Sequence, residues 1–95
     1  MKLKVSQDTY DELQRLVDCA LTASSKKVAE PYIKRMRFLH VTGGYGGPAN
    51  ILFGEVVSSA ERASGRISDK ERLCGFAKQS LYKLSDHIGD EDGGC

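Results

Sequence analysis

Apolar residues recur at intervals of three and four along most of this chain, the spacing that places side chains on one face of an α-helix. The clearest stripe follows Ser6 and consists of Tyr10, Leu13, Leu16, Val17, Ala20 and Leu21. Ser6 is a favourable N-cap because its hydroxyl can accept a hydrogen bond from an amide in the first turn. Val5 and Tyr10 occupy the two positions of a hydrophobic staple, and Asp8 suits the positive end of the helix dipole. The sequence therefore predicts a helix over residues 6–24.

The second helix is predicted from the position of Pro31. Proline is best accommodated in the first turn of a helix, where its missing amide leaves no hydrogen bond unmade. A helix over residues 31–40 would carry on its inner face Tyr32, Met36 and Leu39. Residues 35–38 also alternate between basic and apolar side chains, so a short strand stays open as the alternative.

A cluster of glycines separates this segment from the third helix. Four of the five residues 43–47 are glycine, and their backbone entropy makes residues 42–47 a predicted loop. Pro48 suits the opening of a helix over residues 48–64, and Gly65 suits its end. The apolar face of this helix comprises Ile51, Leu52, Phe53, Val56, Val57, Ala60 and Ala63.

The last helix is predicted over residues 68–88. Ser68 and Glu71 fit the capping-box pattern, in which the two side chains satisfy each other's free amides. Gly89 is a natural stop. The apolar stripe between them comprises Leu73, Phe76, Ala77, Leu81, Leu84 and Ile88.

These patterns predict an all-α fold, with three to four helices in a single domain over residues 1–89 and a flexible acidic tail over residues 90–95. A chain of 95 residues buries only a thin core, which leaves little room for a deep pocket. No stretch has the pattern of a signal peptide or a transmembrane helix. An odd number of widely spaced cysteines, Cys19, Cys74 and Cys95, is typical of reduced thiols. We therefore expect a cytoplasmic protein.

The residue types needed for catalysis are present but are not arranged in a recognisable motif. Cys19 or Cys74 would need a histidine base and an orienting acid, and no local signature connects either thiol to His40 or His87. Buried cysteines usually act as small apolar side chains. There is also no Cys-x-x-Cys and no pair of histidines four residues apart to bind a metal. We expect no enzymatic activity, no cofactor and no metal.

A basic segment is the first candidate for partner binding. Lys26, Lys27, Lys34, Arg35 and Arg37 are accompanied only by the acidic Glu30. Such side chains can contact phosphates, or they can meet an acidic protein surface. The net charge of +1 argues against a dedicated DNA-binding domain.

The glycine-rich loop is the second candidate. Gly47-Pro48 can present a proline to a host peptidyl-prolyl isomerase, because glycine adds no side chain that would clash with the enzyme's pocket. Tyr45 would supply an aromatic anchor of the kind enriched at binding hot spots. The structural alternative is that Pro48 simply begins a helix with a trans peptide bond.

In its Ser6–Leu21 helix and its Gly43–Pro48 loop, the chain resembles the anti-RecBCD recombination proteins of P22-type lambdoid phages. The resemblance covers most of the chain and lies in size and general character. It implies a phage protein, acting in the host cytoplasm, that binds the host RecBCD helicase-nuclease. Such a protein inhibits or modulates the processing of DNA ends, and it has no catalytic residues. The alternative function is a small nucleic-acid-binding protein that uses residues 26–37.

Overall fold

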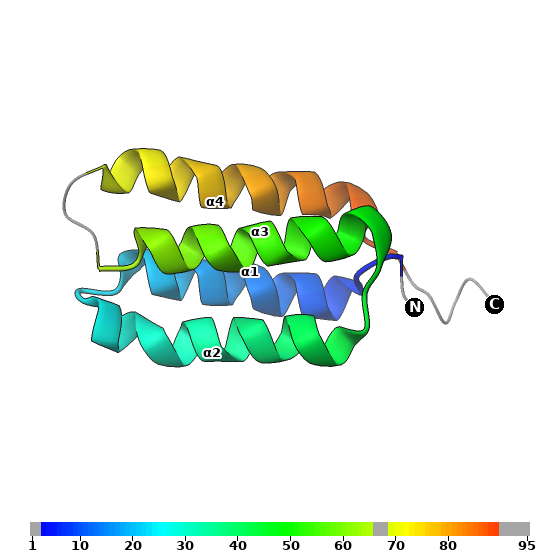
Figure 1. Ribbon diagram of the computed structural model, residues 1–95, viewed down its shortest axis with the longest axis horizontal. Coiled ribbons are helices and arrows are strands. Elements are labelled where there is room, and N and C mark those ends of the chain that lie inside the picture. Colours follow the sequence, from blue (N-terminus) through cyan, green and yellow to red (C-terminus); the bar gives the residue numbers. More distant parts are fainter. Residues whose placement is uncertain (1–2, 66–68, 90–95) are drawn as a thin grey trace.

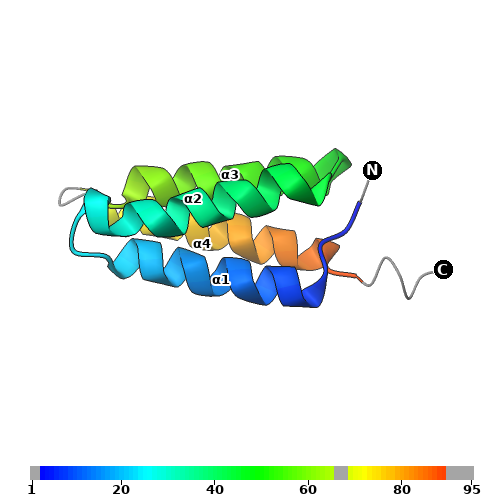
Figure 2. The same cartoon turned by 90° about the horizontal axis from the view of Figure 1, so that it is seen from below.

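The computed structural model describes residues 3–65 and 69–89, and these residues form an antiparallel four-helix bundle (Figure 1). The helices are α1 (Gln7–Thr22), α2 (Lys26–Gly43), α3 (Gly47–Ala63) and α4 (Lys70–Leu84), followed by a short 3₁₀ helix, Ser85–His87. Together the two views place α3 beside both α2 and α4, with α1 completing the bundle (Figure 2). The all-α class predicted from the sequence is confirmed.

Helix α1 begins as its sequence predicts. The Ser6 hydroxyl accepts a hydrogen bond from the Thr9 amide at 3.2 Å. The apolar stripe faces the core and includes Leu13, Leu16, Val17, Ala20 and Leu21. Burial of each aliphatic side chain of this size contributes about 1.5–3 kcal/mol. The predicted bounds, 6–24, are confirmed to within two residues at each end.

Helix α2 is longer than predicted at both ends, so the bounds 31–40 are wrong. Ser25 is its N-cap, with its hydroxyl accepting a hydrogen bond from the Val28 amide at 3.2 Å. Pro31 therefore lies beyond the first turn, where it leaves the carbonyl of Lys27 without its helical donor. Both residues are exposed, so water can take the place of that donor. The alternative of a short strand at residues 35–38 is also wrong.

The predicted loop over residues 42–47 is shorter than expected, because α2 continues through Gly43 and α3 starts at Gly47. Gly44 ends α2 with a φ of 66°, and Gly47 has a φ of 62°. Both values lie in the left-handed region that favours glycine. The Tyr45 ring packs so closely on Gly43 that a Cβ atom there would lie 2.1 Å from a ring carbon. These glycines have structural roles in the turn.

Helix α3 confirms the predicted range 48–64 to within one residue. Gly65 follows it with a φ of 72°, as expected for a glycine that ends a helix. Helix α4 lies within the predicted range 68–88, whereas the predicted cap Ser68 and the predicted tail 90–95 fall outside the described residues. Two side chains that were assigned to inner faces are exposed instead, Ile51 at 62% and Phe76 at 51%.

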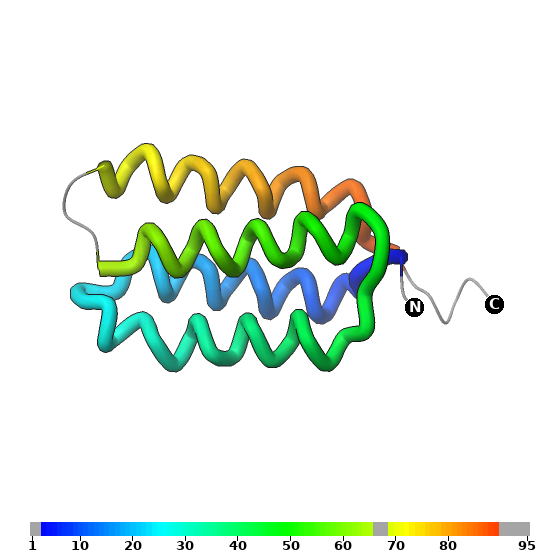
Figure 3. The backbone as a smooth tube through the Cα atoms, in the orientation of Figure 1, coloured from blue at the N-terminus to red at the C-terminus, as the bar shows by residue number. Residues whose placement is uncertain are grey.

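The core runs along the centre of the bundle and draws on all four helices. Its largest fully buried side chains are Phe53, Leu13, Met36, Leu84, Val5, Val17 and Val56. Among the described residues, every buried polar side-chain atom has a hydrogen-bond partner. The connections between helices lie at alternate ends of the bundle, with the α1–α2 turn at one end and the α2–α3 turn at the other (Figure 3).

Extended residues at the two ends of the domain are hydrogen-bonded side by side. Val5 and Ile88 form an isolated parallel bridge. The Val5 amide donates to the His87 carbonyl at 2.8 Å, and the Gly89 amide donates to the Val5 carbonyl at 2.9 Å. Because the Val5 side chain is also fully buried, this contact ties the segment before α1 to the segment after α4.

Candidate partner-binding surface

The basic segment lies on the solvent side of α2. The helix turns its buried stripe of Ala29, Ile33 and Met36 toward the core. The basic side chains point away from that stripe, and all are exposed: Lys26, Lys27, Lys34, Arg35 and Arg37. The structure therefore places these five predicted site residues on one helix, along almost its whole length.

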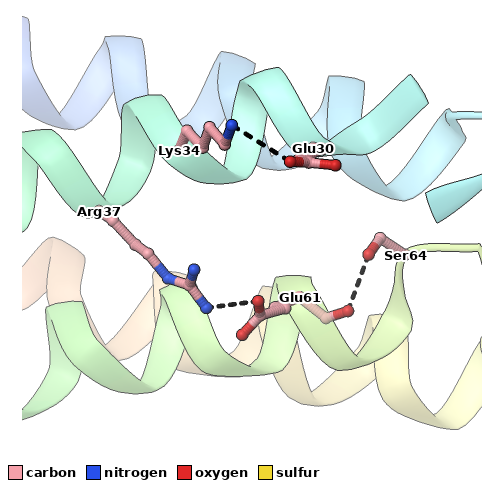
Figure 4. Close-up of polar contacts among 5 residues, drawn as sticks. All are labelled: Glu30, Lys34, Arg37, Glu61 and Ser64. Carbon is pink, nitrogen blue, oxygen red and sulfur yellow. Dashed lines mark hydrogen bonds and ion pairs between the residues drawn. The ribbon is translucent and has the colours of Figure 1, made fainter. Parts of the chain in front are cut away.

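Three of these cations have carboxylate partners within the protein. Lys34 Nζ lies 3.2 Å from Glu30 Oε1, and Arg35 Nε lies 2.9 Å from Glu12 Oε2 on α1. Arg37 reaches across to Glu61 on α3 (Figure 4). Exposed ion pairs contribute only about 0–1 kcal/mol each, but they reduce the net charge offered to a partner.

Lys26 and Lys27 differ from these three, since neither forms an ion pair with any described residue. They lie in the first turn of α2, where the helix dipole is unfavourable to positive charge. The uncompensated basic charge of the segment is therefore concentrated at the start of α2.

Exposed apolar side chains share this surface with the cations. Side chains three and four positions apart lie on one face of a helix, and that spacing links Lys27, Pro31, Lys34, Phe38 and Val41 into one row. Phe38 is 55% exposed and Val41 is 77% exposed. We call this row the α2 outer face. It is basic near the start of the helix and apolar near its end.

Two further side chains flank the α2 outer face on the side of α1. Val28 is 50% exposed. The guanidinium carbon of Arg35 lies 5.4 Å from the centre of the Phe38 ring, a cation–π geometry. Arg35 is thus held between the Phe38 ring and the carboxylate of Glu12. The aromatic ring and the charge beside it form an ordered surface.

A small hollow adjoins the outer face on the side of α3. Its volume is about 150 Å³, and its lining comprises Lys26, Glu30, Ile33, Lys34, Arg37, Glu61 and Ser64. Ser64 is 3% exposed, and its hydroxyl donates to the Glu61 carbonyl at 2.7 Å (Figure 4). The hollow is polar at its rim and large enough for one side chain of a partner, but not for a substrate with its own reaction chemistry.

Tyr45 is packed against the core. Its ring stacks on Phe53 with 5.2 Å between the ring centres, and His40 stacks on the same ring, also at 5.2 Å. Burial raises the pKa of the Tyr45 hydroxyl, and a hydrogen bond with Thr9 partly opposes that rise. Tyr45 is half-buried, so it holds the α2–α3 turn to the bundle instead of projecting as a free anchor.

Gly47 and Pro48 are both exposed at the α2–α3 end of the bundle. Pro48 lies in the first turn of α3, and no described peptide bond is cis. This end of the bundle also carries Val41, whereas Lys26 and Lys27 lie at the opposite end, near the start of α2 (Figure 1). The structure thus brings the predicted proline site close to the apolar part of the outer face and away from its basic part.

The groups considered for catalysis do not converge. Cys19 lies on α1 and Cys74 on α4, each partly buried. His40 on α2 has its Nε2 atom 2.8 Å from the Asn50 side-chain oxygen. Within residues 3–65 and 69–89, no group of three or more His, Cys, Asp or Glu side chains could hold a metal ion. In the same part of the chain, no helix combines the length and apolar character needed to span a bilayer.

The sequence-based prediction missed the apolar half of the outer face. Phe38 and Val41 stand in the same row as Lys34, and that spacing is visible in the sequence once α2 is known to run through Gly43. A helix ending at residue 40 and starting at Pro31 hides it. No family model, curated protein or solved structure matches the chain.

Proposed function

We propose that this chain is a binding protein without enzymatic activity, and that it docks on a larger protein through the α2 outer face. The observation that carries the proposal is the exposure of Phe38 and Val41 in one row with basic side chains. Burial of an aromatic or aliphatic side chain of this kind contributes about 1.5–3 kcal/mol. Mixed basic and apolar faces of this kind fit apolar grooves with acidic rims.

The proposed partner is the host RecBCD helicase-nuclease, because the chain resembles phage anti-RecBCD proteins. Docking on RecBCD would inhibit or modulate its processing of DNA ends and thereby affect recombination and host defence against phage DNA. The basic residues Lys34, Arg35 and Arg37 would serve as contacts around the apolar centre. Their present carboxylate partners support this role, since an acidic partner can replace them at little cost in free energy.

The test is capture of purified RecBCD by the tagged protein, together with degradation of linear DNA as a functional readout. A Phe38→Ser/Val41→Ser double variant should bind at least about tenfold more weakly, because two apolar contacts are lost. Tyr82→Ser is the matched control, since Tyr82 is 74% exposed on α4. Equal binding by all three proteins would exclude the outer face, and no binding by the wild type would exclude RecBCD.

The second candidate function is nucleic-acid binding through residues 26–37. The observation in its favour is that Lys26 and Lys27 are exposed and form no ion pair with the described residues. A salt titration of DNA affinity tests it, because each phosphate contact steepens the dependence on salt. The variant Lys26→Ala/Lys27→Ala should reduce the slope by about 1 per lost contact. Absence of any measurable DNA affinity at low salt would exclude this function.

A host peptidyl-prolyl isomerase is a third possible partner, at Gly47-Pro48. Its support is the exposure of both residues at a turn. The variant Pro48→Ala should lose the isomerase from affinity captures while it retains RecBCD. Because Pro48 lies at the start of α3, its replacement should leave the helical content unchanged, which circular dichroism measures. Retention of the isomerase by the variant would exclude this site.

A further inference from the structure

A second hollow lies on a different side of the bundle, between α3 and α4. Its volume is about 640 Å³, and it opens widely to solvent. Two exposed apolar side chains line it, Ile51 from α3 and Phe76 from α4. Small side chains lie between them, notably Ser58 and Ser59. None of the residues of the α2 outer face contributes to this hollow, so the two surfaces are separate.

The exposed crest of α3 explains the shape of the hollow. Glu55, Ser58, Ser59 and Arg62 follow one another at three- and four-residue spacing, so they share one side of the helix. The two serines at the centre of this crest are short, and they allow a second helix backbone to approach closely. The longer charged side chains, Glu55 and Arg62, stand on either side of the serines.

The charges of this crest complement each other under a twofold rotation. Glu55 and Arg62 lie at equal separations in sequence from the midpoint between Ser58 and Ser59. If a second α3 crosses the first in antiparallel orientation at that midpoint, Glu55 of each copy faces Arg62 of the other. Neither side chain has an ion-pair partner among the described residues, so both charges are available.

We infer that the α3–α4 hollow is the site at which two copies of this chain associate, with a twofold axis passing between Ser58 and Ser59. Isologous packing of this kind requires a self-complementary patch, and the Glu55 and Arg62 arrangement supplies one. The two intermolecular ion pairs set the register, and apolar contacts provide the affinity.

Phe76 supplies the apolar contact nearest to the axis. Helices α3 and α4 run antiparallel on either side of the connection 64–69, so Phe76 on α4 lies roughly level with Ser58 on α3. The Phe76 rings of the two copies therefore meet beside the axis. Burial of an aromatic ring contributes about 1.5–3 kcal/mol per copy, which suits a weak, concentration-dependent dimer.

The α2 outer face remains free in this arrangement, because α2 does not line the hollow. A dimer would therefore carry two outer faces. Two linked binding surfaces raise the effective affinity for a partner that offers two sites. Dimer formation does not depend on whether the outer face binds RecBCD, so the two proposals stand or fall separately.

The experiment is sedimentation velocity on the full chain, from about 1 µM to about 500 µM, a range that covers weak association. A reducing buffer prevents disulfide-linked dimers through the cysteines. The wild type should shift from monomer to dimer across this range. Glu55→Arg and Arg62→Glu should each weaken association at least about tenfold, because each variant places like charges opposite one another twice. The double variant Glu55→Arg/Arg62→Glu should restore the dimer.

The matched controls are Asp18→Arg and Arg15→Glu on α1, which change the net charge equally at exposed positions away from the hollow. Both should dimerise like the wild type, and Phe76→Ser should dimerise less. A wild type that stays monomeric at every concentration overturns the inference. Failure of the double variant to recover the dimer, or equal loss in the controls, overturns the proposed register. A monomer that binds another protein through this hollow would assign the site to that partner instead.

Discussion

Helices α2 and α3 are neighbours of similar length, yet they use their surfaces in opposite ways. Helix α3 buries Ala49, Phe53, Val56, Val57, Ala60 and Ala63, and its solvent side carries short serines. Helix α2 buries only Ala29, Ile33 and Met36, and its solvent side carries large apolar and basic side chains. The difference indicates that α3 contributes mainly to folding, whereas α2 contributes less to folding and offers more surface to a partner.

Removal of the Phe53 ring should produce the largest effect. Phe53 is fully buried and is stacked by both His40 and Tyr45, so Phe53→Ala leaves a cavity at the centre of the α2–α3 end. We expect a loss of about 3–5 kcal/mol in the free energy of unfolding, measured by urea denaturation. A loss below about 1 kcal/mol would mean that α3 does not anchor the core.

The next effect tests the place where the end of α3 meets the start of α2. Gly65 has a φ of 72°, and a Cβ atom there would lie 2.5 Å from the backbone nitrogen of Lys26. Gly65→Ala therefore combines backbone strain with a clash, and it should cost about 2–4 kcal/mol. Gly44→Ala is the control, because Gly44 has a similar φ of 66° but open space around it. Equal losses in the two variants would show that strain alone matters.

Alkaline pH should weaken the link between the α2–α3 turn and α3. Burial raises the pKa of Tyr45 above the ordinary value of 10.0, and Tyr10 is raised for the same reason. The unfolded chain then releases these protons at lower pH than the folded chain does. The stabilisation is therefore complete below about pH 10 and is lost as pH rises through the folded pKa values.

The measurement for this effect is the free energy of unfolding between about pH 8 and about pH 11. Tyr45→Phe and Tyr10→Phe should each flatten its decline, since phenylalanine cannot ionise. Tyr82→Phe is the control because Tyr82 is largely exposed. The interpretation would be wrong if that control flattened the decline as much as the other two variants.

The smallest effect on stability should come from the outer face of α2. Phe38→Ser removes an aromatic ring that is 55% exposed, so we expect a change within about 0.5 kcal/mol in the free energy of unfolding. The same variant in combination with Val41→Ser is expected to weaken partner binding. A large loss of stability from Phe38→Ser would contradict the contrast between α2 and α3, because it would make Phe38 part of the fold.

The helices could be predicted where a cap and an apolar stripe agree. Ser6 and the stripe after it give the start of α1, and Gly65 gives the end of α3. The prediction failed at α2 because Pro31 was taken as a start, whereas the Ser25 cap and packing on the other helices hold a proline inside the helix. That error also hid the row that connects Lys34 to Phe38 and Val41.

The sequence by itself determined the helical class, the approximate helix bounds and the presence of a basic segment, because spacing and capping are local properties of the chain. Tertiary structure alone decided which side chains remain exposed. Ile51 and Phe76 follow the apolar spacing of their helices, yet α3 and α4 leave both at the surface. It also paired Arg35 with Glu12 and Arg37 with Glu61, since such pairs join residues far apart in the chain. Exposure and long-range pairing depend on how the helices pack, and local spacing does not encode that packing.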